Sequence, residues 1–408
     1  MFMDYWKLLS RQPAFLIYGL LAACLSSFGQ TFYISLFGGE LRAAFDLSHG
    51  DFGLLYSIAT LSSGILLLWL GRSVDRFDLR LVTAAVLLGL ATACILLGTA
   101  QSLILITLAL FGLRLFGQGM MGHLAVTSMG RYFHQARGRA VSIAASGYPL
   151  GEAVFPFLAV VLIGLVGWRG SWLIAGIGLL VLGIPLLLSL LRGHGRRRRA
   201  WELRQQRLQR DTGMAWTWGV TDVLRDGRFW ALLPIVLSPP FFITGFFFHQ
   251  VHLAEAKDWP LSWLAGAFVV FAFFQVAGLG IAGSLTDRFS ARRLLVAYLL
   301  PMAAALVLLA VVEARVWVVP YMALLGMSAG AAGTVAGAIW AELYGTRNLG
   351  AIRAVHTTTM VFATAGSPWL MGILLDGGIT IEGIALVSAG WLVLVTLLGW
   401  LLQPALRR

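Results

Sequence analysis

The feature that most constrains this chain of 408 residues is a succession of apolar stretches, each about 20 residues long. A hydrocarbon core about 30 Å thick is crossed by roughly 20 such residues in an α-helix, and we count twelve stretches of this kind. In lipid a helix satisfies its backbone polar groups internally, whereas an open sheet edge cannot. We therefore predict an all-α integral membrane protein with helices over residues 14–37, 50–70, 79–99, 102–130, 139–166, 171–191, 229–252, 260–283, 293–312, 316–343, 351–375 and 383–403.

Composition supports this class and excludes several others. Apolar residues make up 59% of the chain and charged residues 12%, where a soluble domain has roughly 25% charged residues. Both cysteines, Cys24 and Cys94, fall inside apolar stretches, which argues against a disulfide framework. The sequence has no H-E-x-x-H, cysteine pair or Walker motif, so we expect no metal, no cofactor and no enzymatic activity.

The basic residues predict the orientation. With the N-terminus placed in the cytoplasm, 25 of the 30 Lys and Arg residues lie on the cytoplasmic side. We therefore expect a multi-pass protein of the cell inner (plasma) membrane with both termini cytoplasmic. The densest basic run, "GHGRRRRAWELRQQRLQR" from Gly193 to Arg210, directly follows an apolar stretch. This position favours contact with anionic lipid headgroups over binding to nucleic acid.

The chain also carries two similar charged loops, each between two apolar stretches. A basic linker over residues 192–228 leaves six apolar stretches in residues 1–191 and six in residues 229–408. The loop "GRSVDRFDLR" begins at Gly71 and the loop "GSLTDRFSAR" begins at Gly283, an offset of 212 residues that Pro156 and Pro368 share. A common offset predicts duplicated halves, an arrangement that secondary transporters use to alternate between two faces.

These loops resemble the cytoplasmic G-x-x-x-D-R-x-G-R-R/K motif of the major facilitator superfamily, although Asp78 and Ser290 stand where the second Gly is expected. The resemblance covers the whole chain and implies twelve transmembrane helices in two pseudo-symmetric six-helix halves. It also implies a conformational latch that holds the cytoplasmic side together in one state. The alternative is a plain solvated turn. The matching latch positions are Gly71, Asp75, Arg76 and Arg80 in the first loop and Gly283, Asp287, Arg288 and Arg292 in the second.

A second resemblance lies in "LRLFGQGMMGHL", which is similar to the family's R-x-x-Q-G motif in helix 4 but has one residue more between Arg114 and Gln118. Arg114 is expected near mid-membrane, where placing a charged side chain has a high free-energy cost. A rise of 1.5 Å per residue places Glu152 of helix 5 at a similar depth. We predict that the two form an ion pair in which Arg114 binds substrate and Glu152 relays a proton. A purely structural pair that orients helices 4 and 5 is the alternative.

Other polar residues are placed by helical spacing. Residues on shared helix faces could line a cavity, or could serve only interhelical hydrogen bonds. The predicted substrate-binding set is Arg114, Gln118, Gln30, Tyr33, Tyr148 and Gln275. Among the histidines, His123 and His356 are possible proton carriers. His49, His249 and His252, which lie outside or near the outer end of helix 7, receive no role.

A mid-membrane arginine favours an anionic substrate. The segment "FGQTFYISLFGGEL" is loosely similar to helix 1 of bacterial monocarboxylate and oxalate-formate type members of the superfamily. We therefore expect a monomeric secondary transporter whose partners are protons, membrane lipids and a small monocarboxylate-like anion carried by symport. Two alternatives stay open: an exporter of drugs or amphipathic metabolites working by proton antiport, and a membrane sensor that binds without transporting.

Overall fold

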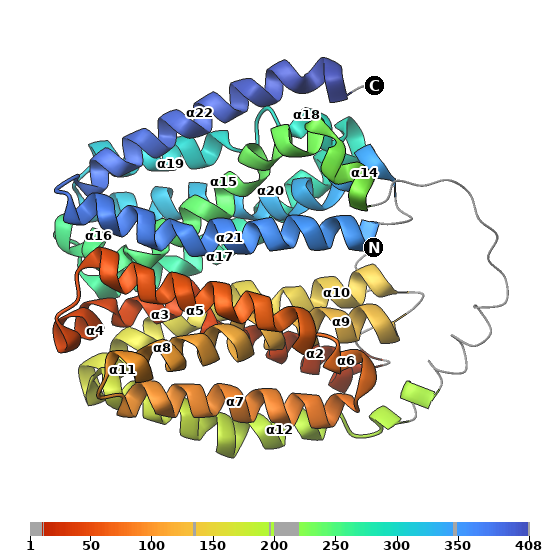
Figure 1. Ribbon diagram of the computed structural model, residues 1–408, viewed down its shortest axis with the longest axis vertical. Coiled ribbons are helices and arrows are strands. Elements are labelled where there is room, and N and C mark those ends of the chain that lie inside the picture. Colours follow the sequence, from red (N-terminus) through yellow and green to blue (C-terminus); the bar gives the residue numbers. More distant parts are fainter. Residues whose placement is uncertain are drawn as a thin grey trace. The chain divides into compact units, whose positions relative to one another are not determined.

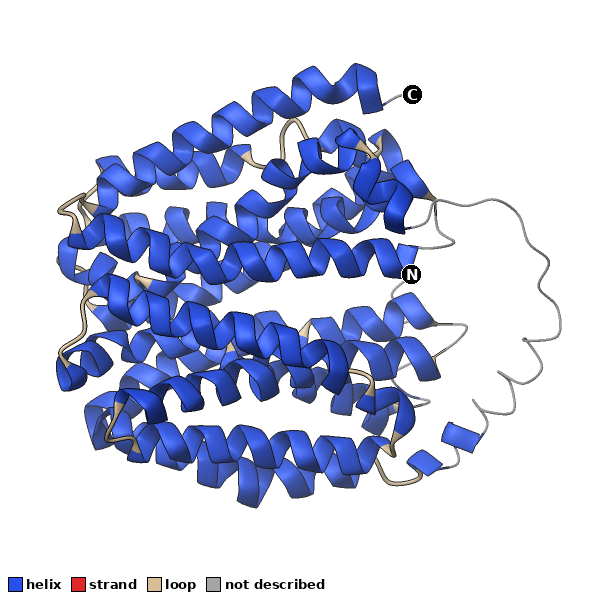
Figure 2. Ribbon diagram, in the orientation of Figure 1, coloured by secondary structure: helices blue, strands red, loops and turns tan. Residues whose placement is uncertain are grey.

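The computed structural model describes residues 10, 12–133, 136–195, 197–199, 220–345 and 349–406. Within these ranges every regular element is helical and no strand occurs, as Figure 2 shows. The predicted all-α class is therefore confirmed. Most of the basic linker, residues 200–219, lies outside the described residues, and its contact with lipid stays a prediction.

The chain divides into two compact units. The first contains the described residues of Met1–Phe37 and Ile58–Met214, and the second those of Gly38–Ser57 and Ala215–Arg408. The Gly38–Ser57 segment thus belongs with the second unit, and helix α5 has residues in both. Division of the chain at residues 191 and 229 stays a prediction.

Helices α2, α3 and α5–α12 contribute to the first unit and α4 and α14–α22 to the second (Figure 1). In the N-terminal part of the chain they are α2 (Pro13–Leu25), α3 (Thr31–Ile34), α4 (Gly38–Phe45), α5 (His49–Leu70), α6 (Ser73–Arg76), α7 (Leu79–Thr99), α8 (Leu103–Gly112), α9 (Gly122–Tyr132), α10 (Arg137–Ala145), α11 (Gly147–Gly178) and α12 (Ile184–Leu190). In the C-terminal part they are α14 (Val220–Arg225), α15 (Gly227–Phe248), α16 (Gln250–Ala256), α17 (Leu261–Phe289), α18 (Ala291–Leu294), α19 (Leu300–Val311), α20 (Val318–Tyr344), α21 (Leu349–Asp376) and α22 (Ile381–Leu406).

Nine of the described helices are long and apolar enough to cross a membrane, and the bent pair Pro13–Gly29 and Thr31–Phe45 makes a tenth. One of the nine, Gly138–Leu190, covers two predicted stretches and is interrupted at Gly167, whose φ of 71° and ψ of 171° are not helical. Helix α19 is a shorter apolar helix. These elements are consistent with the predicted count of twelve, which stays a prediction.

Small residues and prolines shape the second unit. A Cβ atom on Gly326 or Gly330 of α20 would overlap backbone carbonyls of α17, so the two helix backbones touch there. Helix α15 contains three prolines, of which Pro239 cannot bond the carbonyl of Ile235. The hydroxyl of Tyr298 donates to that carbonyl at 2.7 Å and satisfies it.

Candidate substrate site

The first membrane helix is broken in the middle. Helix α2 ends at Leu25, a 3₁₀ turn runs over Ser26–Gly29, and Gln30 is extended (ψ 150°) before α3 begins. The two halves meet at an angle of 46°. Serine and glycine are poor helix formers in this position, and the break turns backbone carbonyls away from the helical ladder. Such broken helices are typical of binding sites in secondary transporters.

Helix 4 is also irregular, in the segment that contacts the break in helix 1. Residues Leu113–Met121 form a π-helix between α8 and α9. A π-helix takes up one more residue per hydrogen-bonded turn, which explains the extra residue between Arg114 and Gln118. π-helical segments are rare and frequent at functional sites.

The two irregular segments are in backbone contact. A Cβ atom on Gly117 would lie 2.7 Å from the backbone N and Cα of Gly29. A Cβ atom on Gly29 would lie 2.5 Å from the backbone N of Gln118. Both separations are too short for any side chain, so the crossing requires glycine on each helix. The break in helix 1 is thereby held against the π-helical segment.

Arg114 lies at this crossing and is 2% exposed. Its Nε donates to Thr60 Oγ1 at 3.0 Å, and its Nη1 donates to the carbonyl of Gly29 at 3.0 Å. The side chain therefore joins α5, the break in helix 1 and the π-helical segment, all within the first unit. Burial of a guanidinium is tolerated only where its donors find acceptors of this kind.

Thr60 was not predicted as a site residue, although the sequence carries a signal for it. Ser57, Thr60 and Ser63 follow one another at three-residue spacing on an otherwise apolar helix, and all three are buried. Ser63 donates to the carbonyl of Thr60 at 2.8 Å. A row of hydroxyls at i, i+3 and i+6 marks a helix face that meets polar groups.

Tyr148 and Glu152 are carried by α11, which crosses α2 at two glycines. A Cβ atom on Gly147 would lie on the carbonyl of Leu20, and one on Gly151 would lie on the Ser27 hydroxyl. This close crossing sets where Tyr148 and Glu152 lie along helix 1. Glu152 is half-buried. Its pairing with Arg114 stays a prediction.

The other predicted substrate-binding residues differ from one another in burial and in their contacts. Gln30 Nε2 lies 3.5 Å from Ser26 Oγ, and Gln118 is half-buried. The ring of Tyr33 is 2% exposed and packs among other aromatic rings at centroid distances of 5.2 to 6.0 Å. Those rings belong to Phe28, Phe37, Phe155 and Trp172.

Gln275 lies on α17 and belongs to the second unit, whereas the other members of the set belong to the first. Its Oε1 is buried without a hydrogen-bond partner among the described residues. Buried amide oxygens are normally bonded, so this atom is an acceptor still to be satisfied. A role for Gln275 in substrate binding stays a prediction.

The first predicted latch loop is bound to α9. His123 Nε2 lies 3.2 Å from the Gly71 carbonyl, and Arg131 Nη1 donates to the carbonyl of Val74 at 2.8 Å. Arg76 and Arg80 are exposed. The side chain of Asp75 lies outside the described part of the chain, so its latch role stays a prediction.

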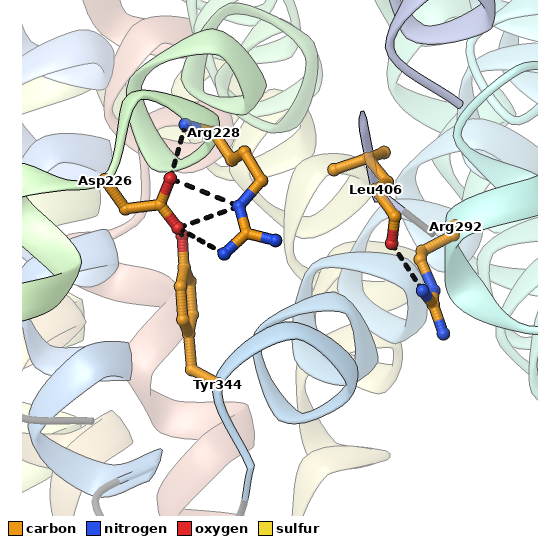
Figure 3. A network of polar contacts seen from close by, with 5 residues as sticks. All are labelled: Asp226, Arg228, Arg292, Tyr344 and Leu406. Carbon is orange, nitrogen blue, oxygen red and sulfur yellow. Dashed lines mark hydrogen bonds and ion pairs between the residues drawn. The ribbon is translucent and has the colours of Figure 1, made fainter. Parts of the chain in front are cut away.

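The second predicted latch loop contacts α20 and α22. Glu342 accepts from the backbone N–H of Ala291 at 2.6 Å and lies 3.4 Å from Arg292 Nε. Arg292 Nη1 also donates to the carbonyl of Leu406, as Figure 3 shows. The same figure shows Asp226 held by Arg228 and by the hydroxyl of Tyr344.

The remaining residues of the second loop have fewer contacts. The guanidinium of Arg288 lies 5.2 Å from the centroid of the Phe289 ring. A Cβ atom on Gly283 would meet no described atom within 4 Å. For Gly283, Asp287 and Arg288 the latch role stays a prediction.

The two loops differ at the position of the missing motif glycine. Ser290 has a φ of 76° and a ψ of 151°, a conformation that favours glycine. Asp78 has a φ of −63° and caps α7, because its Oδ1 accepts from the Arg80 N–H at 2.8 Å. The same turn is therefore made in two ways, one strained and one capped.

Solved structures with a similar fold include two proteins described as transporters or transporter homologues. A bacterial homologue of the human lysosomal transporter Spinster, in an inward-facing and occupied conformation, is 16% identical with a TM-score of 0.67, and the match covers 95% of each chain. A POT family transporter in complex with 5-aminolevulinic acid is 13% identical with a TM-score of 0.68, and the match covers 96% of this chain and 97% of that one. At these low sequence identities, the similarity shows a shared fold and nothing about substrate.

Sequence comparison gives the family. No curated protein sequence matches this chain. The family described as the Major Facilitator Superfamily matches residues 19–269, which is more than half of the chain. This chain therefore belongs to the Major Facilitator Superfamily and is a membrane transporter rather than an enzyme.

Proposed function

We propose that this transporter carries a small organic anion, with a monocarboxylate as first choice, across the cell inner membrane by proton-coupled alternating access. The observation that carries the proposal is Arg114, 2% exposed at the crossing of a broken helix and a π-helical segment. Interior charges in transporters commonly bind substrate or relay protons.

The surroundings of Arg114 support an anion. Two of its acceptors, Thr60 Oγ1 and the Gly29 carbonyl, are neutral groups. The planar guanidinium matches a carboxylate in shape and can donate to both of its oxygens. A substrate carboxylate in this position would exchange an aqueous shell for a charge-assisted contact.

Glu152 is our proposed proton carrier. It lies on α11 directly after Gly151, where α11 is in contact with helix 1 at the Ser27 hydroxyl. A carboxylate near a buried arginine changes its protonation when a second anion arrives, which links the proton to the substrate. The structurally similar POT family transporter was solved in complex with 5-aminolevulinic acid, a small organic acid, which supports the proposed class of substrate.

One observation favours the second candidate, an exporter of amphipathic compounds. Tyr33 is surrounded by the rings of Phe28, Phe37, Phe155 and Trp172 near the break in helix 1. Aromatic rings pack on flat apolar bodies more readily than on small carboxylates, so an opening of this buried group at the break would favour an amphipathic substrate.

A thermal-shift screen of small carboxylates on the purified protein tests the proposal. A ligand at 100 times its dissociation constant stabilises the folded state by about 2.7 kcal/mol. We expect stabilisation by one or more monocarboxylates, its loss in Arg114→Gln, and its retention in the matched control Arg169→Gln, whose guanidinium contacts the Ala100 carbonyl. Stabilisation only by apolar amines or neutral amphipaths would favour the exporter.

A further inference from the structure

Three histidines to which the sequence pattern gives no role meet in the second unit. His49 begins α5, His249 lies at the junction of α15 and α16, and His252 lies on α16. The ring centroid of His49 is 4.6 Å from that of His252 and 5.7 Å from that of His249. We call these three residues the histidine cluster.

The hydrogen bonds define which protons the cluster holds in this state. Arg42 Nη1 lies 3.2 Å from His49 Nε2. A guanidinium nitrogen only donates, so His49 Nε2 accepts and His49 is neutral. His249 Nε2 lies 3.0 Å from the carbonyl of Pro368 and therefore carries the hydrogen of that bond.

One ring of the cluster, that of His249, has little access to water, whereas His49 and His252 are half-buried. His249 is 3% exposed, and burial lowers its pKa to about 3. The pKa of His252 is also lowered by burial, an effect that Glu255 opposes and Arg42 reinforces. The docked arrangement of these residues therefore favours neutral rings.

Charged groups face the cluster from every element packed against it. They are Arg42 of α4, Glu255 of α16, Asp376 of α21 and Glu382 of α22, whereas Asp51 of α5 accepts from the Ser48 N–H at 3.3 Å. Asp376 accepts from the backbone N–H groups of His49 and Gly50 at 3.0 and 2.7 Å. Glu382 pairs with the buried Lys257 at 3.0 Å. These two carboxylates are thus already engaged, whereas Arg42 opposes any further positive charge.

The Gly38–Ser57 segment is docked on α21 through backbone contacts. A Cβ atom on Gly53 would lie 2.7 Å from the carbonyl of Pro368, and one on Gly372 would lie 2.6 Å from the carbonyl of His49. The Phe52 and Tyr56 rings also pack on Phe248, at 5.0 and 4.8 Å. Such close packing leaves no room to hydrate a protonated His249 ring without separating the helices.

We propose that the histidine cluster is a proton-binding site and that its protonation releases the Gly38–Ser57 segment from α16 and α21. Helix α5 has residues in both units, and the turns that would be released are those that belong to the second unit. Under the predicted orientation the site faces the external side. The link to transport rests on the proposed function, whereas release by protons does not.

The direction of the pH effect follows from linkage. In the docked state the pKa of His249 and that of His252 lie below the ordinary value of about 6.5, which a released ring would regain. Docking is therefore fully stable above about pH 6.5 and weakens as the pH falls through that value. Each unit of pKa difference changes the opening equilibrium by up to about tenfold per proton.

Hydrogen–deuterium exchange of the full-length protein, without any substrate, tests the proposal. After correction for intrinsic exchange, peptides of the Gly38–Ser57 segment should exchange about tenfold faster at about pH 5.5 than at about pH 7.5. The triple variant His49→Gln, His249→Gln and His252→Gln should lose this pH dependence, because glutamine can still accept from Arg42 and donate to the Pro368 carbonyl but does not titrate. His194→Gln, a buried histidine of the first unit, should retain it.

A fixed charge provides the converse test. His252→Lys should raise exchange of the segment at about pH 7.5, whereas Ala256→Lys, one turn further on the exposed side of α16, should leave it unchanged. Equal exchange at the two pH values in the parent protein, or an unaltered pH dependence in the triple glutamine variant, would overturn the proposal. Neither result would alter the case for anion transport, because no substrate is present.

Discussion

Arg114 donates to the backbone carbonyl of Gly29 at 3.0 Å, across 85 positions of the chain. The acceptor is free because helix 1 leaves its helical path at Gln30. The donor reaches it because the π-helical segment lies directly on Gly29. Two local departures from α-helical geometry therefore create one buried charged site.

Gly117→Ala should destabilise the protein by about 1–3 kcal/mol, because the new Cβ atom would lie 2.7 Å from the Gly29 backbone, which cannot move aside cheaply. Gly119→Ala is the matched control. Its Cβ atom would lie 3.3 Å from the ends of the Leu67 side chain, which can rotate away. Thermal unfolding in detergent should separate the two variants, and equal melting temperatures would contradict the backbone crossing.

Arg114→Gln should abolish carboxylate-induced stabilisation while leaving a folded, monodisperse protein, because glutamine is neutral. If Arg114 and Glu152 form an ion pair that serves only the structure, we expect a different result. Removing one partner would then destabilise the protein by about 3–5 kcal/mol, and the double change Arg114→Gln with Glu152→Gln would restore both fold and transport. Carboxylate uptake into liposomes measures transport, and full uptake by the double variant would remove both residues from the site.

Glu152→Gln alone should retain carboxylate binding but lose accumulation driven by a pH gradient, because a neutral amide cannot release a proton. Uptake into liposomes with and without an imposed gradient measures this directly. If gradient-driven accumulation persists in this variant, the coupling proton is carried elsewhere.

Ser290→Gly should stabilise the protein by about 1 kcal/mol, because a φ of 76° with a ψ of 151° strains any residue that has a Cβ atom. Ser284→Gly, inside α17, should have the opposite sign, since glycine is unfavourable in a helix. Midpoints of denaturation in increasing SDS would compare them. A loss of stability in Ser290→Gly would show that the serine side chain matters more than the strain.

Cysteine introduced at Ser48 should react with an impermeant thiol reagent added outside cells, and cysteine introduced at Gln205 should react only after the membrane is opened. The native cysteines give little background, since Cys24 is 9% and Cys94 0% exposed. The reverse labelling pattern would contradict the orientation predicted from the basic residues.

The sequence by itself determined the class of fold and the family. Apolar stretches about 20 residues long can only be helices in lipid, and the two charged loops at a common offset carry the family resemblance. One extra residue in "LRLFGQG" already indicated that helix 4 departs from its relatives. These signals lie in short stretches of the chain, so they can be recognised without knowing how the helices pack.

Only the tertiary structure decided which groups meet. Thr60 and Gly29 became partners of Arg114, and Asp376 came to cap His49 across 327 positions, because the rotation and depth of each helix bring those faces together. Hydropathy gives the length of a helix but not its rotation about its axis, and close crossings depend on shape complementarity of both partners. The histidine cluster therefore could not be read from spacing, since its members come from α5, α16 and the turn between α15 and α16.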